Sequence, residues 1–152
     1  MTILDLEILK LDNQLCFALY ACSREINKRY KPHLDTLGIT YTQYVTLLVL
    51  WEKDNLTVKE LGFKLHLDSG TLTPLLKKLE SMDIITRLRD KEDERNVYIK
   101  LTEKGFEMKK EALQIPNKVF CETGLSLEEA ISLRESLKHL LVNLNGSYEK
   151  ND

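Results

Sequence analysis

The chain has 152 residues and a formal net charge of −2 at pH 7, with 43% hydrophobic and 30% charged residues. This composition is ordinary for one globular domain, and no apolar run reaches the roughly 20 residues that a membrane-spanning helix needs. A near-neutral charge argues against general coating of nucleic acid, so DNA binding would require local basic patches. The acidic start, MTILDLEILKLD, lacks the features of a signal peptide, which predicts a cytoplasmic protein.

The residues that most often bind metals are scattered along the chain. Three cysteines are present, an odd number, and their spacing fits no CxxC metal pair. The three histidines are equally dispersed, so we expect neither a metal site nor a cofactor. In a reducing cytoplasm the cysteines should be free thiols. These residues are Cys16, Cys22 and Cys121, with His33, His66 and His139.

An amphipathic helix is predicted from about Leu11 to Arg29. Its apolar positions recur at intervals of four, three and four, which is the spacing of one helical face. Pro32 disfavours helical geometry at the residue before it and should end this helix. We expect the face to be a packing stripe, Cys22 included: Leu15, Leu19, Cys22 and Ile26.

The next segment has the pattern of a helix-turn-helix. Thr42 is a candidate cap for a helix over TQYVTLLVLWEKD, which is apolar nearly all round and should be buried. Thr57 and Glu60 form a capping box ahead of VKELGFKLH. Asp68 or Ser69 then begins SGTLTPLLKKLESMD. Two short helices joined by a tight turn predict a helix-turn-helix.

A charged hairpin follows at once. Ile84–Arg89 reads as a strand, residues 90–94 form a polar turn, and Asn96–Leu101 alternate polar and apolar side chains. This order predicts a winged helix-turn-helix: a mainly α fold with a small β-hairpin wing.

The C-terminal part is predicted to be helical. Thr102 is positioned to cap EKGFEMKKEALQI, which Pro116 should bend or end, and Ser126 with Glu129 forms a capping box before LEEAISLRESLKHLLVNLN. The terminal helices carry broader apolar stripes than one small domain needs. We therefore expect a homodimer, with a dimerisation region at about 1–40 and 105–148 and a DNA-binding region at about 41–104. The alternative is that these stripes pack against the winged helix of their own chain.

Two groups of residues are candidates for contact with DNA. The second helix of a helix-turn-helix enters the major groove, and a basic wing tip reaches the minor groove. Asp93 is well placed to hold the Arg95 guanidinium by paired hydrogen bonds. The alternative is that these groups merely cap the helix and form a solvated, charge-balanced turn. The candidates are Ser69, Thr71, Thr73, Lys77 and Lys78 in the helix, and Arg87, Arg89, Asp93 and Arg95 in the wing.

Four stretches of the chain resemble the MarR family of winged-helix regulators, and within it the OhrR branch of organic-peroxide-sensing repressors. They are LDNQLCFALYACSRE, YKPHLDTLGITYTQY, LDSGTLTPLLKKLE and RDKEDERNVYIKLTEKG. The resemblance implies a homodimeric repressor of operator DNA. It also implies a reactive cysteine near the dimer interface, hydrogen-bonded by tyrosine hydroxyls of the partner subunit. Cys16 occupies the place of that cysteine, Tyr30 and Tyr41 occupy those of the tyrosines, and Tyr20 is a further neighbour.

The implied signal is an organic hydroperoxide that oxidises Cys16 to a sulfenic acid. Hydrogen bonds from phenols favour the reactive thiolate, and the apolar neighbours Leu15, Phe17 and Leu19 favour an organic oxidant. By resemblance to the two-cysteine subgroup, Cys121 would form an intersubunit disulfide with Cys16 and release the DNA. The alternative is a one-cysteine sensor in which Cys121 has no role.

Two other functions fit the same residues. One is a MarR-type repressor released by a small phenolic or lipophilic ligand. The other is a thiol peroxidase, although no arginine or threonine partner lies beside Cys16 in the sequence. We expect a regulator without catalytic residues.

Overall fold

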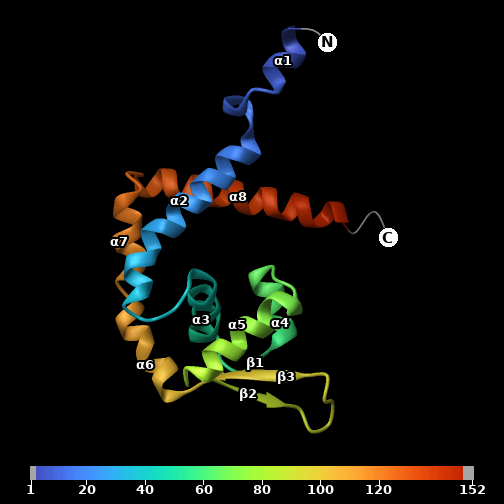
Figure 1. Ribbon diagram of the computed structural model, residues 1–152, viewed down its shortest axis with the longest axis vertical. Coiled ribbons are helices and arrows are strands. Elements are labelled where there is room, and N and C mark those ends of the chain that lie inside the picture. Colours follow the sequence, from blue (N-terminus) through green and yellow to red (C-terminus); the bar gives the residue numbers. More distant parts are fainter. Residues whose placement is uncertain (1–2, 149–152) are drawn as a thin grey trace. The chain divides into compact units, whose positions relative to one another are not determined.

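The central helices of the chain lie beside a small sheet, and the sheet's hairpin extends beyond them (Figure 1). This computed structural model describes residues 3–148, and the side chains of residues 6–146. The chain divides into two compact units, Met1–Pro116 and Asn117–Asp152. The elements in order are α1 (Ile3–Ile8), a 3-10 turn (Leu11–Asn13), α2 (Leu15–Asp35), α3 (Tyr41–Glu52), β1 (Leu56–Thr57), α4 (Val58–Leu65), α5 (Ser69–Ser81), β2 (Ile85–Arg89), β3 (Val97–Leu101), α6 (Glu103–Ala112), α7 (Ile115–Glu122) and α8 (Leu127–Tyr148).

The wing is a three-stranded antiparallel sheet of order β1-β3-β2. Ile85 lies opposite Leu101 and Arg87 lies opposite Ile99, so the hairpin register places the apolar residues of β3 on one buried face. The predicted fold class is confirmed. The additional strand β1 pairs Leu56 with Ile99, and its two residues are too few for any periodicity to reveal.

The core of the first unit lies between α3, α4, α5 and the sheet. In α5 the predicted inner face is buried at Leu72, Leu76 and Leu79, while Leu75 is half-buried. Each fully buried leucine contributes roughly 1.5–3 kcal/mol relative to an exposed one, so this face holds α5 firmly against the rest of the unit. The other fully buried residues of this core include Leu47, Leu50, Leu61, Ile84 and Ile99.

The capping predictions hold at three helices and fail at one. Thr57, Thr102 and Ser126 accept hydrogen bonds from the first turns of α4, α6 and α8 as expected. The cap of α3, however, is Thr40 and not Thr42. The backbone N–H of Gln43 donates to Thr40 Oγ1 at 3.3 Å, and Gln43 Oε1 accepts from the Thr40 backbone at 2.9 Å. This reciprocal box starts the helix two residues early, which leaves Thr42 inside the first turn.

The bounds of α2 also differ from the prediction. The helix begins at Leu15 and continues through Pro32 to Asp35, whereas we expected it to run from about Leu11 and to end near the proline. Leu34, in the turn after Pro32, is only 2% exposed. Burial of this side chain outweighs the local cost of a proline in the last turns of a helix.

Pro116 separates two helices, as predicted. Helix α6 ends at Ala112, and Pro116 is the second residue of α7, where a missing backbone N–H is tolerated. The sequence reasoning did not foresee α7, which is only eight residues long. Among residues 3–148, none of the helices combines the length and the apolarity that crossing a bilayer requires.

Candidate functional site

The N-terminal half of α5 presents polar groups to solvent. Its cap is Asp68, whose Oδ1 accepts from the Thr71 backbone N–H at 2.7 Å, and this hydrogen bond lowers the pKa of the Asp68 carboxyl. The Thr73 hydroxyl donates to the Ser69 carbonyl at 2.7 Å. All five helix residues predicted to meet DNA are at least partly exposed: Ser69, Thr71, Thr73, Lys77 and Lys78.

The wing tip holds one arginine in a fixed orientation. Arg95 donates from Nε and Nη2 to the two carboxylate oxygens of Asp93, at 2.9 and 3.0 Å. The hydrogen bonds from the Arg95 side chain and backbone keep the pKa of Asp93 below its ordinary value, so the carboxylate stays charged. The Arg95 side chain is 89% exposed. The tip therefore presents a guanidinium that is oriented and still accessible.

The other two wing arginines make contacts within the protein. Arg89 Nη1 donates to the Glu94 carbonyl at 2.9 Å, which braces the hairpin turn. Arg87 Nε donates to Glu80 Oε2 at 2.8 Å, and this ion pair joins β2 to the end of α5. The position of the wing relative to α5 thus depends on a side-chain contact as well as on the backbone.

All three cysteines are exposed in the chain. Cys16 lies in the first turn of α2, and Cys121 lies in α7. Cys22 is exposed in the single chain, so the packing expected for it is not made within this chain. Leu34 is the only residue of α2 classed as buried among the described side chains, because α2 packs on α3 near its C-terminal end and its earlier turns are open.

Three tyrosine rings lie together where α2 meets the start of α3. The ring centroids of Tyr30 and Tyr41 are 5.0 Å apart, and Tyr44 lies 5.6 Å from Tyr30 and 6.2 Å from Tyr41. Burial raises the pKa of Tyr30 and of Tyr41, and raises that of Tyr44 to about 12, with the neighbouring phenols adding to the shift in Tyr30 and Tyr44. At neutral pH all three phenols are therefore protonated hydrogen-bond donors.

The sequence reasoning singled out Tyr30 and Tyr41 and missed Tyr44. Tyr44 is 1% exposed and supports the other two rings from within the core. Its spacing of three residues from Tyr41 on one helix was the signal available.

Cys16 and the tyrosines do not meet within one chain. Tyr30 lies fourteen residues after Cys16 on the continuous helix α2, and a rise of 1.5 Å per residue separates them by about 21 Å. No tyrosine side chain extends that far. Any contact between this thiol and these phenols must be made between two copies of the chain.

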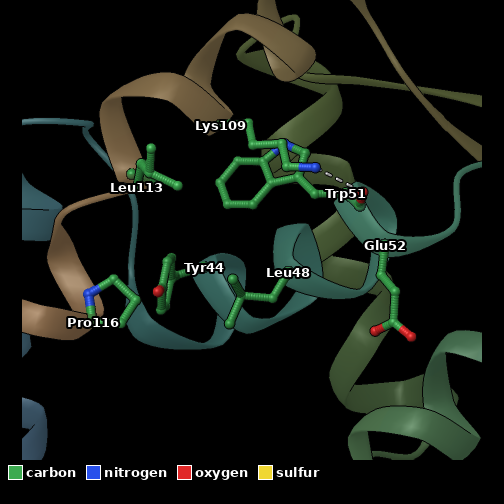
Figure 2. A pocket seen from close by; sticks show the side chains of 8 residues that line it. Tyr44, Leu48, Trp51, Glu52, Lys109, Leu113 and Pro116 are labelled. Carbon is green, nitrogen blue, oxygen red and sulfur yellow. Dashed lines mark hydrogen bonds between the residues drawn. The ribbon is translucent and has the colours of Figure 1, made fainter.

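A pocket of about 280 Å³ lies between α3 and α6 (Figure 2). Tyr44, Leu48 and Trp51 line it from α3, while Leu113 and Pro116 close the other side. Lys109 Nζ donates to the Trp51 carbonyl at 3.2 Å, and Trp51 Nε1 donates to the Gly105 carbonyl at 2.9 Å. The lining is mostly apolar, and its charged residues are Lys109 and Glu52.

Comparisons with known proteins agree with this arrangement. Residues 28–112 match a family described as "Transcriptional regulator SarA/Rot". The chain is 51% identical to an organic hydroperoxide resistance transcriptional regulator of Bacillus subtilis, over 94% of this chain and 95% of that protein. It is 45% identical to the transcriptional regulator SarZ of Staphylococcus saprophyticus, over 86% of this chain and 90% of SarZ.

The solved structures include AbfR of Staphylococcus epidermidis in more than one redox state. Reduced AbfR bound to DNA matches with a TM-score of 0.77 and 35% identity, over 94% of this chain and 99% of that one. Disulfide-formed AbfR matches with a TM-score of 0.61 and 33% identity, over 96% and 97% of the two chains.

The polar α5 and the basic wing define a winged-helix DNA-binding regulator. The extent of the matches settles the family. This chain belongs to the MarR/SarA family of winged-helix transcriptional regulators, and it is similar to OhrR and SarZ. That family consists of regulators and not enzymes, which argues against the thiol peroxidase alternative.

Proposed function

We propose that this protein is a redox-sensing repressor. As a reduced homodimer it binds operator DNA, and oxidation of Cys16 by an organic hydroperoxide releases it. The observation that carries the proposal is the separation of about 21 Å along α2 between an exposed Cys16 and Tyr30, which belongs to the tyrosine cluster. Only a second copy of the chain can bring the Tyr30 and Tyr41 phenols to this thiol, so the proposed chemistry of the sensor and its dimeric state are linked.

The first chemical step takes place at the Cys16 sulfur. The thiolate attacks the terminal oxygen of the hydroperoxide, the O–O bond breaks, and the alkoxide leaves with a proton as an alcohol. The sulfur loses two electrons and becomes a sulfenic acid. Tyr30 and Tyr41 of the partner supply protonated hydroxyls that stabilise the thiolate, consistent with their raised pKa values. Leu15 and Phe17, both largely exposed, form an apolar approach that favours an organic peroxide.

The second step uses Cys121. Its thiolate attacks the sulfenic sulfur of the other subunit, forms an S–S bond and releases water. A disulfide holds its two Cα atoms within about 7 Å, so it constrains the helices that carry them. The movement would misalign the two winged helices with their half-sites. Disulfide-formed AbfR is a precedent for a disulfide in a relative.

The dimer is proposed to form through residues of about 1–40 and 105–148, leaving 41–104 to bind DNA. The leucine stripe of α8 supports this division, because it is partly or fully exposed in the isolated chain. The stripe consists of Leu133, Leu137, Leu140, Leu141 and Leu144.

The test is DNA binding by the wild type and three single variants, Cys16→Ser, Cys121→Ser and Cys22→Ser, with and without cumene hydroperoxide. We expect the wild type and Cys22→Ser to be released, and Cys16→Ser to remain bound. Non-reducing electrophoresis should show a covalent dimer that both Cys16→Ser and Cys121→Ser abolish. Release of Cys16→Ser by peroxide would refute the sensor. Release without any covalent dimer would favour a one-cysteine mechanism.

The pocket between α3 and α6 favours a second candidate function, release by a small ligand. Its aromatic and aliphatic lining with Lys109 at the edge suits a small phenolic or aromatic acid. In that case an aromatic acid such as salicylate would release Cys16→Ser and wild type alike. Leu48→Trp, which fills the pocket, would abolish this response and leave the peroxide response intact.

A further inference from the structure

A second pocket, of about 230 Å³, lies between α4, α5 and the wing. Three separate segments form its walls: Thr57–Lys59 at the start of α4, Thr73 and Leu76 on α5, and Arg87, Arg89 and residues 95–97 of the wing. All of these segments belong to the first compact unit. We refer to this space as the α4–wing pocket.

The lining of the α4–wing pocket is strongly cationic. Of its ten lining residues four carry a positive charge and none of these described residues is a carboxylate. The four cations are Lys59, Arg87, Arg89 and Arg95. Carboxylates outside this lining balance two of the four charges, because Arg87 pairs with Glu80 and Arg95 pairs with Asp93. Lys59 and Arg89 are left as the positive charges that no carboxylate of the described residues balances.

Three of the four cations already have protein partners. Arg87 pairs with Glu80, Arg95 pairs with Asp93, and Arg89 donates to the Glu94 carbonyl. Within the described part of the chain, Lys59 is the one cation of this pocket that no described residue engages. Its ammonium is exposed and carries three donors. The arginines therefore shape the pocket, while Lys59 remains available to a ligand.

The position of the α4–wing pocket indicates which part of a bound DNA duplex it would face. In winged-helix docking the recognition helix enters the major groove and the wing tip reaches the minor groove beside it. Those neighbouring grooves are separated by one sugar-phosphate strand. A pocket whose walls belong to α5 on one side and to the wing on the other therefore faces that strand.

We propose that the α4–wing pocket receives a backbone phosphate of the bound duplex, and that Lys59 is its principal charged contact. This inference rests on the proposed DNA-binding function and adds a residue outside the recognition helix and the wing tip. A phosphate oxygen accepts from the Lys59 ammonium, with Arg89 contributing a second positive charge at the rim. The contact fixes the register of the protein on DNA without reading a base.

The test compares two charge-neutral variants of the same helix, Lys59→Gln and Lys64→Gln. Lys64 is equally exposed, lies in the last turn of α4, and is not among the residues that line the pocket. The probe is a short duplex selected from a random library by the reduced wild-type protein. Affinity is measured by fluorescence anisotropy over a series of KCl concentrations.

The proposed homodimer carries two copies of Lys59, so the variant loses two phosphate contacts. This loss lowers the slope of log K against log [salt] by about 1.8, which corresponds to roughly 60-fold weaker binding at 0.1 M salt and roughly 18-fold at 0.2 M. We expect this result for Lys59→Gln, a much smaller change for Lys64→Gln, and near wild-type binding for Lys59→Arg. Equal slopes for Lys59→Gln and wild type, or equal changes in the two glutamine variants, would overturn the proposal.

A second measurement locates the contact. Duplexes that carry a single neutral methylphosphonate at successive backbone positions should reveal one position in each half-site, between the two grooves, that weakens wild-type binding and does not further weaken Lys59→Gln. Additive losses at every position would contradict a direct contact. If the reduced wild-type protein selects no duplex at all, the proposed DNA-binding function itself fails, so the two failures are distinguishable.

Discussion

The clearest functional prediction concerns Asp93→Asn at the wing tip. Two effects of this change oppose each other. Removing a negative charge near DNA phosphates strengthens binding, whereas losing the bidentate partner of Arg95 leaves a long, 89% exposed side chain free to move. The sign of the net effect shows whether Asp93 serves as an orienting group or merely as a surface charge.

The positioning effect is the larger of the two. Ordering a side chain as flexible as arginine on binding weakens affinity by roughly two- to tenfold, since the free protein no longer holds Arg95 in place. An exposed charge about 10 Å from the phosphates changes affinity by less than about twofold in water at physiological salt. We therefore expect Asp93→Asn to bind DNA more weakly, by roughly two- to tenfold for each protomer of the proposed dimer.

Glu92→Gln is the matched control. It removes the same charge from the same turn, but the Glu92 carboxylate does not contact Arg95, and only its backbone N–H bonds to Asp90. Anisotropy titrations at one salt concentration should give slightly tighter binding for Glu92→Gln and weaker binding for Asp93→Asn. If both variants bind more tightly than wild type, Arg95 does not depend on Asp93 for its orientation.

Three further predictions concern stability. Gly105→Ala places a Cβ 2.3 Å from the Ile84 carbonyl oxygen, and the resulting overpacking of about 1–3 kcal/mol exceeds the helical gain of about 0.5–1 kcal/mol. Urea unfolding should show a net loss, whereas Gly146→Ala, whose Cβ meets no atom within 4 Å, should be neutral or stabilising. Tyr44→Ala should cost about 3–5 kcal/mol because it empties a site that is 1% exposed, and a loss below 1 kcal/mol would contradict its role in supporting the cluster. Because folding lowers the pKa of the Asp68 carboxyl, the cap stabilises the folded state fully at pH values above the ordinary pKa of aspartate. This stabilisation is lost as the pH falls through the pKa that Asp68 has in the folded state. The melting temperature should therefore fall on acidification below about pH 4, and it should fall less steeply with pH in Asp68→Asn than in the wild type. If the two proteins show the same slope of melting temperature against pH, the Asp68 cap is not a source of the pH dependence.

Hydrogen bonds between residues close in sequence were largely predictable. The capping box of Thr57 with Glu60 and the pairing of Asp93 with Arg95 span only two or three residues, so few backbone torsions decide them. The one local error was at α3, where Gln43 three residues after Thr40 marks the true cap.

Tertiary structure decided the features that join distant elements. The Glu80–Arg87 ion pair links α5 to β2, and the Trp51 indole reaches the Gly105 carbonyl of α6. Lys59 reads in the sequence as one more surface lysine, and only the packing of α4 beside α5 and the wing makes it part of a cationic pocket.

Periodicity and capping signals by themselves determined the longer helices, the β-hairpin of the wing, and which residues are exposed on α5, but they did not reveal α7 or β1. These signals did not show where long-range packing outweighs a local preference. In α2, for example, burial of Leu34 stabilises the helix beyond Pro32. The physical reason is the distance in sequence between the interacting residues. A cap or an amphipathic face depends on neighbours within one or two helical turns. A pocket or a salt bridge between elements depends instead on how whole faces are buried. The clustering of Tyr30 with Tyr41 and Tyr44 is a case of the second kind, because α2 must pack on α3 to bring the three rings together.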